Sequence, residues 1–150
     1  MLTPSAHAED EDYGFQFDLT KDDQHAVVLD YRYSAGSRTL ISADREYAKS
    51  EKGYYGENVV GRMPRGTTLY VKWRDTITNQ VTEDTVELGR FLPRDMDGKK
   101  IFLMIRGPQL QIFIISRAPH EPGAPLVGPS LWAGRTALQV YPPLSQTKTN

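Results

Sequence analysis

Residues 68–75 carry the pattern that most restricts the fold, because apolar and polar side chains alternate strictly along them. The apolar set comprises Leu69, Val71 and Trp73. Successive side chains of an extended chain point to opposite faces, so the alternation predicts a β-strand with one buried face. A polar loop and a second alternating segment, residues 81–88, follow and predict a hairpin. Because the outward side chains are cationic on the first strand and anionic on the second, we expect charge pairs across the hairpin.

Several other segments have the composition of strands, namely residues 26–33, 38–42, 101–106, 109–116 and 136–141. In the first, Leu29, Tyr31 and Tyr33 alternate with charged residues, which predicts that these three share a buried face. The pair 101–106 and 109–116 is almost continuously apolar and flanks a Gly-Pro turn, so we expect a central hairpin covered on both faces.

Helix-forming residues are concentrated in one short segment, residues 43–52, which predicts at most two turns of helix. Short strands separated by glycine and proline are typical of antiparallel β architectures. The sequence therefore predicts an all-β fold, an antiparallel two-sheet sandwich of about six to eight strands with at most one short helix.

The chain has 150 residues, of which 39% are hydrophobic, and this is enough for one core. Residues 1–12 are small, polar and acidic, and we expect a disordered lead-in there. A single β-sandwich domain is expected over residues 13–142, followed by a flexible tail over residues 143–150. The proline-rich and glycine-rich stretch 119–129 predicts a long loop with a functional or packing role.

The formal net charge of −1 hides an asymmetry along the chain. Residues 1–25 hold seven acidic residues and one lysine, whereas the remainder carries an excess of five basic residues. These bases are scattered among acids and form no basic run with interleaved aromatic residues, so we expect no binding of nucleic acid. The longest apolar run is Ile101–Ile105, which is too short to span a bilayer.

No arrangement of residues predicts catalysis. The sequence around Ser130 lacks the second glycine and the following helix that form the nucleophile elbow of serine hydrolases. The three histidines, which lack the spacing of metal ligands, are His7, His25 and His120. The paired acidic residues fit ordinary turns, and the chain has no cysteine. We therefore expect no catalytic residue, no cofactor and no metal site.

Aromatic and arginine residues outside the expected strands are the best candidates for binding a partner protein. Such side chains bury a large area and keep a polar end satisfied, which makes them frequent at interfaces. The first choice is the tyrosine-rich segment with two arginine anchors: Arg45, Tyr47, Tyr54, Tyr55 and Arg62. The second is the loop that contains Trp132 and Arg135. The alternative is that these rings cap the ends of the sandwich.

The order of motifs from Met63 to Ser116 resembles that of a known group of proteins. The motifs are a Met-Pro turn, Leu-Tyr-Val-Lys-Trp-Arg, Glu-Asp-Thr-Val-Glu-Leu, Leu-Pro with an Asp-rich turn, and Ile-Arg-Gly-Pro-Gln-Leu-Gln-Ile-Phe-Ile. Together they resemble small proteobacterial lipoproteins that are encoded beside phospholipase effectors of the type VI secretion system and act as immunity proteins.

The resemblance implies a periplasmic protein, tethered to a membrane by a lipidated cysteine, that binds an incoming secreted lipase and inhibits it. The sequence departs from that pattern in having neither leader nor cysteine, and we expect both to lie ahead of residue 1 in the natural protein. The matched residues belong to scaffold strands, so the resemblance assigns no inhibitory residue. The alternatives are a structural lipoprotein of an envelope or secretion assembly and, third, an enzyme.

Overall fold

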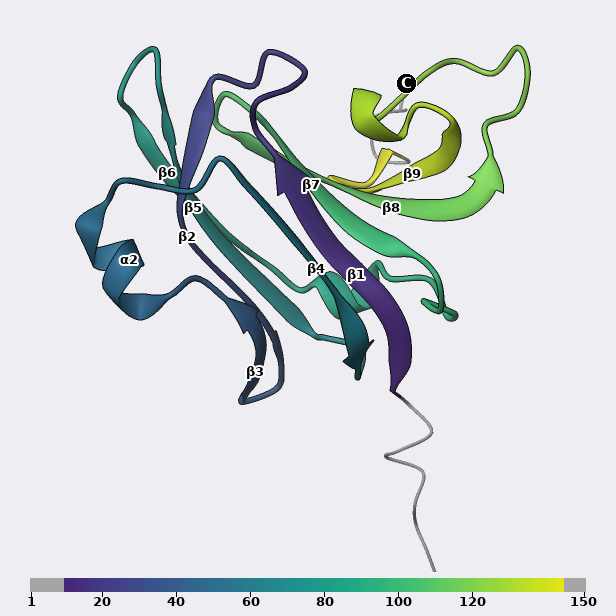
Figure 1. The fold of residues 1–150 in the computed structure, drawn as a ribbon, viewed down its shortest axis with the longest axis horizontal. Coiled ribbons are helices and arrows are strands. Elements are labelled where there is room, and N and C mark those ends of the chain that lie inside the picture. Colours follow the sequence, from purple (N-terminus) through teal and green to yellow (C-terminus); the bar gives the residue numbers. More distant parts are fainter. Residues whose placement is uncertain (1–9, 145–150) are drawn as a thin grey trace, which may run out of the picture.

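The computed structural model describes residues 10–144 and contains nine strands in two sheets (Figure 1). The five-stranded sheet has the order β4-β1-β7-β8-β9 and the four-stranded sheet the order β3-β2-β5-β6. The strands are β1 (Glu11–Asp18), β2 (Ala26–Ala35), β3 (Arg38–Ser42), β4 (Gly56–Met63), β5 (Thr68–Asp75), β6 (Val81–Val86), β7 (Lys100–Arg106), β8 (Gln109–Pro119) and β9 (Arg135–Tyr141). The all-β sandwich is confirmed, with nine strands rather than six to eight.

The helical content is small, as expected. One α-helix, α2 (Arg45–Ser50), lies within the segment predicted to be helical, and two 3₁₀ turns complete the set in residues 10–144: η1 (Leu88–Arg90) and η2 (Ser130–Trp132). The first turn explains why the strand expected over residues 81–88 ends at Val86, since Leu88 already belongs to η1.

Strands β1 and β4 were not predicted. In β4 the half-buried positions hold Glu57, Val59 and Gly61 rather than a run of large apolar residues, so no alternating signal exists. Strand β1 begins inside the segment expected to be disordered, because Glu11 and Asp12 pair with Met63 and Arg62 of β4. Residues 1–9 of the expected lead-in, and residues 145–150 of the expected tail, lie outside the described part of the chain.

One strand pair departs from the antiparallel prediction. β1 and β7 run parallel, with Gly14 opposite Lys100 and Phe17 opposite Leu103. β4 pairs antiparallel with the other edge of β1, so β1 is an internal strand of its sheet (Figure 1). Parallel neighbours need a long connection, and here the connection includes the whole four-stranded sheet.

The main core lies between the two sheets and is rich in aromatic residues. Phe15 of β1 stacks on Tyr31 and Tyr33 of β2, with ring centroids 5.9 and 6.1 Å apart. A β-bulge between Val28 and Asp30 shifts the register of β2. As a result Val28, Tyr31 and Tyr33 belong to the main core and Leu29 does not, so the predicted alternation starting at Leu29 was wrong at its first residue.

A second, smaller core covers the outer face of the five-stranded sheet. It contains Phe102 and Met104 of β7 and Phe113 and Ile115 of β8, with Trp132 and Ala137 packed against them. This confirms that the central hairpin is covered on both faces. Trp132 of η2, which follows the expected loop over residues 119–129, packs on this core, whereas residues 121–127 of the loop are exposed.

The charge pairs predicted across the β5–β6 hairpin do not form ion pairs among the described residues. Lys72 and Glu83 face each other in register, but Glu83 accepts a hydrogen bond from the Tyr70 hydroxyl at 2.7 Å. Burial and this carboxylate raise the pKa of Tyr70 to about 12. No ion pair joins Lys72 to Glu83 within residues 10–144.

Candidate functional site

The residues predicted to bind a partner fall into separate places. Arg45, Tyr47, Tyr54 and Tyr55 lie in or next to α2, and we call these four residues the tyrosine surface. Trp132 and Arg135 lie in η2 and at the start of β9. Because α2 and β9 occupy opposite sides of the molecule along its longest axis (Figure 1), the structure does not bring the two groups together.

A capped turn positions α2. The Asp44 carboxylate accepts hydrogen bonds from the backbone N–H groups of Glu46 at 2.8 Å and Tyr47 at 3.1 Å, which is the usual N-cap arrangement. The Asp44 backbone N–H in turn donates to the Tyr54 hydroxyl at 3.0 Å. The helix start is therefore tied to the tyrosines that follow it.

The tyrosines form a ladder from the core to the surface. Tyr31 contacts Tyr54 edge-to-face with centroids 5.4 Å apart, and Tyr54 contacts Tyr47 with centroids 4.8 Å apart. The Tyr47 hydroxyl donates to the Gly53 carbonyl at 2.8 Å. Tyr55 stands apart with 54% of its surface exposed, and its hydroxyl forms no hydrogen bond within the described residues. Tyr54 is thus a structural contact, whereas Tyr47 and Tyr55 are accessible.

Residues 53–55 are held by both sheets. Tyr54 exchanges two backbone hydrogen bonds with Val28 of β2, at 2.7 and 3.0 Å, and the Tyr55 carbonyl accepts from Leu19 N–H at 2.8 Å, just after β1. Gly53 has φ +89°, and a Cβ there would lie 2.1 Å from Val27 Cγ2. Only glycine fits this close approach, so the backbone beneath the tyrosine surface is fixed.

The two arginines predicted to anchor a partner protein, Arg45 and Arg62, differ in their contacts and in their distance from the tyrosines. The Arg45 guanidinium donates to both carboxylate oxygens of Asp30, and its side chain remains 60% exposed. Arg62 donates to the Asp10 carbonyl at 3.0 Å and lies seven residues beyond Tyr55 along β4, roughly 20 Å away at the rise of a strand. Arg62 therefore lies outside the tyrosine surface.

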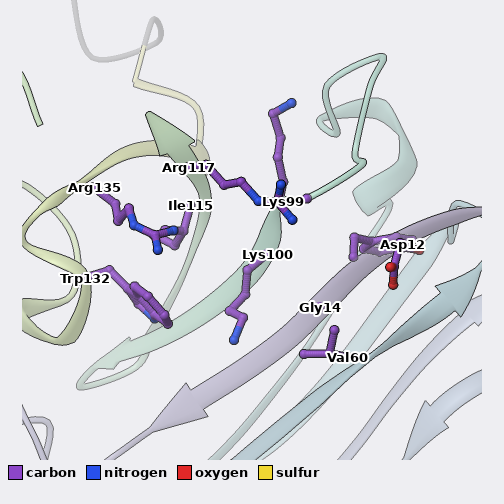
Figure 2. A pocket seen from close by; sticks show the side chains of 11 residues that line it. Asp12, Gly14, Val60, Lys99, Lys100, Ile115, Arg117, Trp132 and Arg135 are labelled. Atoms are coloured by element: carbon purple, nitrogen blue, oxygen red, sulfur yellow. The ribbon is translucent and has the colours of Figure 1, made fainter. Parts of the chain in front are cut away.

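The second group borders a hollow of about 140 Å³ on the outer face of the five-stranded sheet (Figure 2). Three cationic side chains and one ring define it, and we call it the basic hollow: Lys100 of β7, Arg117 of β8, Trp132 of η2 and Arg135 of β9. Asp12, Gly14 and Val60 line the opposite side. Figure 2 shows Arg117 and Arg135 extending from the β8 and β9 side toward the hollow.

Trp132 is the central contact of the basic hollow. Lys100 Nζ lies 5.1 Å and Arg135 Cζ 5.2 Å from the centroid of its ring, which are both cation–π distances. The indole N–H donates to Gln16 Oε1 at 3.1 Å. Lys100 Nζ donates to the same Gln16 oxygen at 3.1 Å and to Asn58 Oδ1 at 2.9 Å. Neutral amides thus hold both the ring and the lysine.

Sequence reasoning missed Lys100, Arg117 and Gln16. Lys100 lies on the outward-facing side of β7, together with Phe102 and Met104. Gln16 lies on β1, which was not predicted. Glycines could have pointed to the hollow, since a Cβ on Gly14 would lie 3.1 Å from Lys100 Cε and one on Gly98 would lie 3.1 Å from Arg117 Cζ. An internal glycine of a strand often marks such a close approach.

Several classes of site are not represented in the part of the chain that the structure covers. Residues 10–144 contain no group of three or more histidine, aspartate or glutamate side chains that could hold a metal ion. Among the same residues no helix has the length and apolar character required to cross a membrane.

Comparison with known proteins adds no relative. No protein-family model, no curated protein and no solved structure matches this chain.

Proposed function

We propose that this protein is an immunity protein that binds a secreted lipase of the type VI secretion system and inhibits it. The partner class comes from the resemblance of residues 63–116 to such proteins. The observation that supports a binding role is the tyrosine surface, where exposed Tyr55 stands on a backbone fixed by both sheets and exposed Tyr47 packs against Tyr54. Little conformational entropy would be lost when such a surface is covered.

In this proposal the lipase contacts Tyr55, Tyr47 and the exposed part of Arg45. Aromatic and arginine side chains supply much of the affinity of protein interfaces, because they combine large apolar area with directed polar groups. The pairing of Arg45 with Asp30 keeps the guanidinium oriented at the edge of this surface. The protein acts in the periplasm, tethered by a lipid anchor ahead of residue 1, where it meets an incoming lipase.

The test is co-expression of this protein, directed to the periplasm, with the lipase encoded by the adjacent gene. Growth should be rescued, and the purified protein should inhibit hydrolysis by that lipase in a one-to-one complex. A neighbouring product that is not a lipase, or a lipase whose activity is unchanged by the protein, would reject the proposal. Constitutive binding to an envelope component would instead favour a structural lipoprotein.

Replacement of Tyr55 locates the interface. We expect Tyr55→Ala to weaken the complex by about 2 kcal/mol, roughly a 30-fold increase in Kd, if this ring is an interface hot spot. Leu138→Ala is the matched control, because Leu138 is 57% exposed on β9, which lies on the side of the molecule opposite to α2 (Figure 1). Calorimetric titration of the lipase with each variant compares the two dissociation constants. Equal affinities would place the interface elsewhere.

A further inference from the structure

The basic hollow contains cations without anionic partners. No carboxylate of residues 10–144 forms an ion pair with Lys100, Arg117 or Arg135, and the two guanidinium groups form no hydrogen bond there. Lys99 also borders the hollow, but its ammonium donates to the Asp95 carbonyl at 2.8 Å. Asp12 is the one acidic residue of the lining. The hollow therefore has a clear excess of positive charge.

These cations are positioned before any ligand arrives. Gly98, with φ +77°, lets the Arg117 guanidinium approach closely, since a Cβ there would lie 3.1 Å from Arg117 Cζ, and the Trp132 ring faces both Lys100 and Arg135. Partial burial, together with the nearby charge of Arg135, lowers the pKa of Lys100. Bringing like charges this close is unfavourable in the free protein, so an anion bound between them would relieve the repulsion.

The charge and size of the hollow indicate the class of anion. Two guanidinium groups and an ammonium exceed what a single carboxylate can neutralise. A phosphate monoester carries about −1.5 to −2 charges at neutral pH and presents three acceptor oxygens, which match the forked donors of arginine. A volume of about 140 Å³ accommodates such a group, and the hollow is open to solvent.

We propose that the basic hollow is a binding site for a phosphate group, with Arg117 and Arg135 as its bidentate donors and Lys100 as a third cation. Trp132 forms the apolar wall and holds two of these cations in place. Free phosphate, a soluble phosphomonoester and a phospholipid headgroup share this chemistry. Strand β9, which provides Arg135, lies on the side of the molecule opposite to α2 (Figure 1), and the site shares no residue with the proposed lipase interface.

The test is calorimetric titration of the full chain with inorganic phosphate, glycerol phosphate and acetate at low ionic strength. Vesicles of phosphatidylcholine, with and without phosphatidic acid, form a separate arm that distinguishes a membrane headgroup from a soluble ligand. We expect a phosphate-bearing probe to bind about tenfold or more tightly than acetate. Tryptophan fluorescence should change with the same midpoint, because Trp132 lines the site whereas Trp73, the other tryptophan, is buried in the core.

Arg117→Gln/Arg135→Gln is the decisive variant, and we expect it to lower the affinity for the bound phosphate probe by about tenfold or more, corresponding to lost charge-assisted hydrogen bonds. Arg38→Gln is the control, since Arg38 is exposed on β3 in the other sheet. Absence of binding by every phosphate probe, equal binding of acetate, or equal losses in the variant and the control would overturn the proposal. Unchanged melting temperatures show that the variants fold.

Discussion

At the scale of single residues, Tyr13 and Tyr33 form the most buried polar contact between the two sheets. The Gly66 N–H donates to the Tyr33 hydroxyl at 2.7 Å, the two hydroxyls lie 2.7 Å apart, and the Tyr13 hydroxyl donates to the Pro64 carbonyl at 2.6 Å. Burial raises the pKa of both phenols, so they stay neutral and continue the chain of hydrogen bonds. Every polar atom in this chain thus has a partner.

Removing one hydroxyl should therefore be costly. We expect Tyr13→Phe to lower the free energy of unfolding by about 1–3 kcal/mol, because the Pro64 carbonyl and the Tyr33 hydroxyl each lose a buried partner. Urea denaturation measures the change. Tyr70→Phe serves as the control, since it removes an exposed hydrogen bond to Glu83 and should cost less than about 1 kcal/mol. Equal losses in the two variants would contradict this account.

At the scale of elements, Asp75 closes the β5–β6 hairpin. Its carboxylate accepts hydrogen bonds from the backbone N–H groups of Ile77 at 2.8 Å and Thr78 at 3.0 Å, and these bonds lower its pKa below the ordinary value of 3.8. A carboxyl group with a lowered pKa stabilises the folded state above its unfolded pKa, and this contribution is lost as the pH falls through the folded pKa.

The stabilisation by Asp75 should accordingly depend on pH. We expect Asp75→Ala to unfold at a lower urea concentration than the unmodified protein at neutral pH, with a difference that shrinks as the pH falls below 3.8. Denaturation midpoints over this pH range provide the measurement. Glu121→Ala, in an exposed loop, is the control for removing a negative charge. A pH-independent difference would show that Asp75 acts by another route.

The way each strand packs explains why some elements could be predicted from the sequence and others could not. Strand β5 buries one face only, so its alternation predicted the bounds of the strand correctly. Strand β4 packs few large apolar side chains, so it shows no regular pattern. Strand β2 was predicted from its alternation, but the β-bulge breaks the period of two and removes Leu29 from the main core. The tyrosine surface was found because its residues are adjacent in the sequence. The basic hollow is lined by residues of five strands and η2, whose proximity no local pattern encodes.

At the scale of the whole molecule, the two candidate surfaces should act independently. Mutations far apart with no shared contacts have additive effects. We expect Tyr55→Ala to leave phosphate binding unchanged, and Arg117→Gln/Arg135→Gln to leave lipase inhibition unchanged. Each variant is titrated with both ligands to measure this. A loss of both activities in one variant would indicate coupling through the sandwich.

The parallel pairing of β1 and β7 has a consequence for synthesis on the ribosome. Gln16 and Lys100, whose side chains meet at the basic hollow, are 84 residues apart in the chain. Strand β1 therefore has one unpaired edge until β7 has been translated, long after β4 has become available for its other edge. Contacts this distant in sequence slow folding and leave strand edges open to aggregation. The nascent chain consequently passes through a stage at which β1 offers an open edge to other chains.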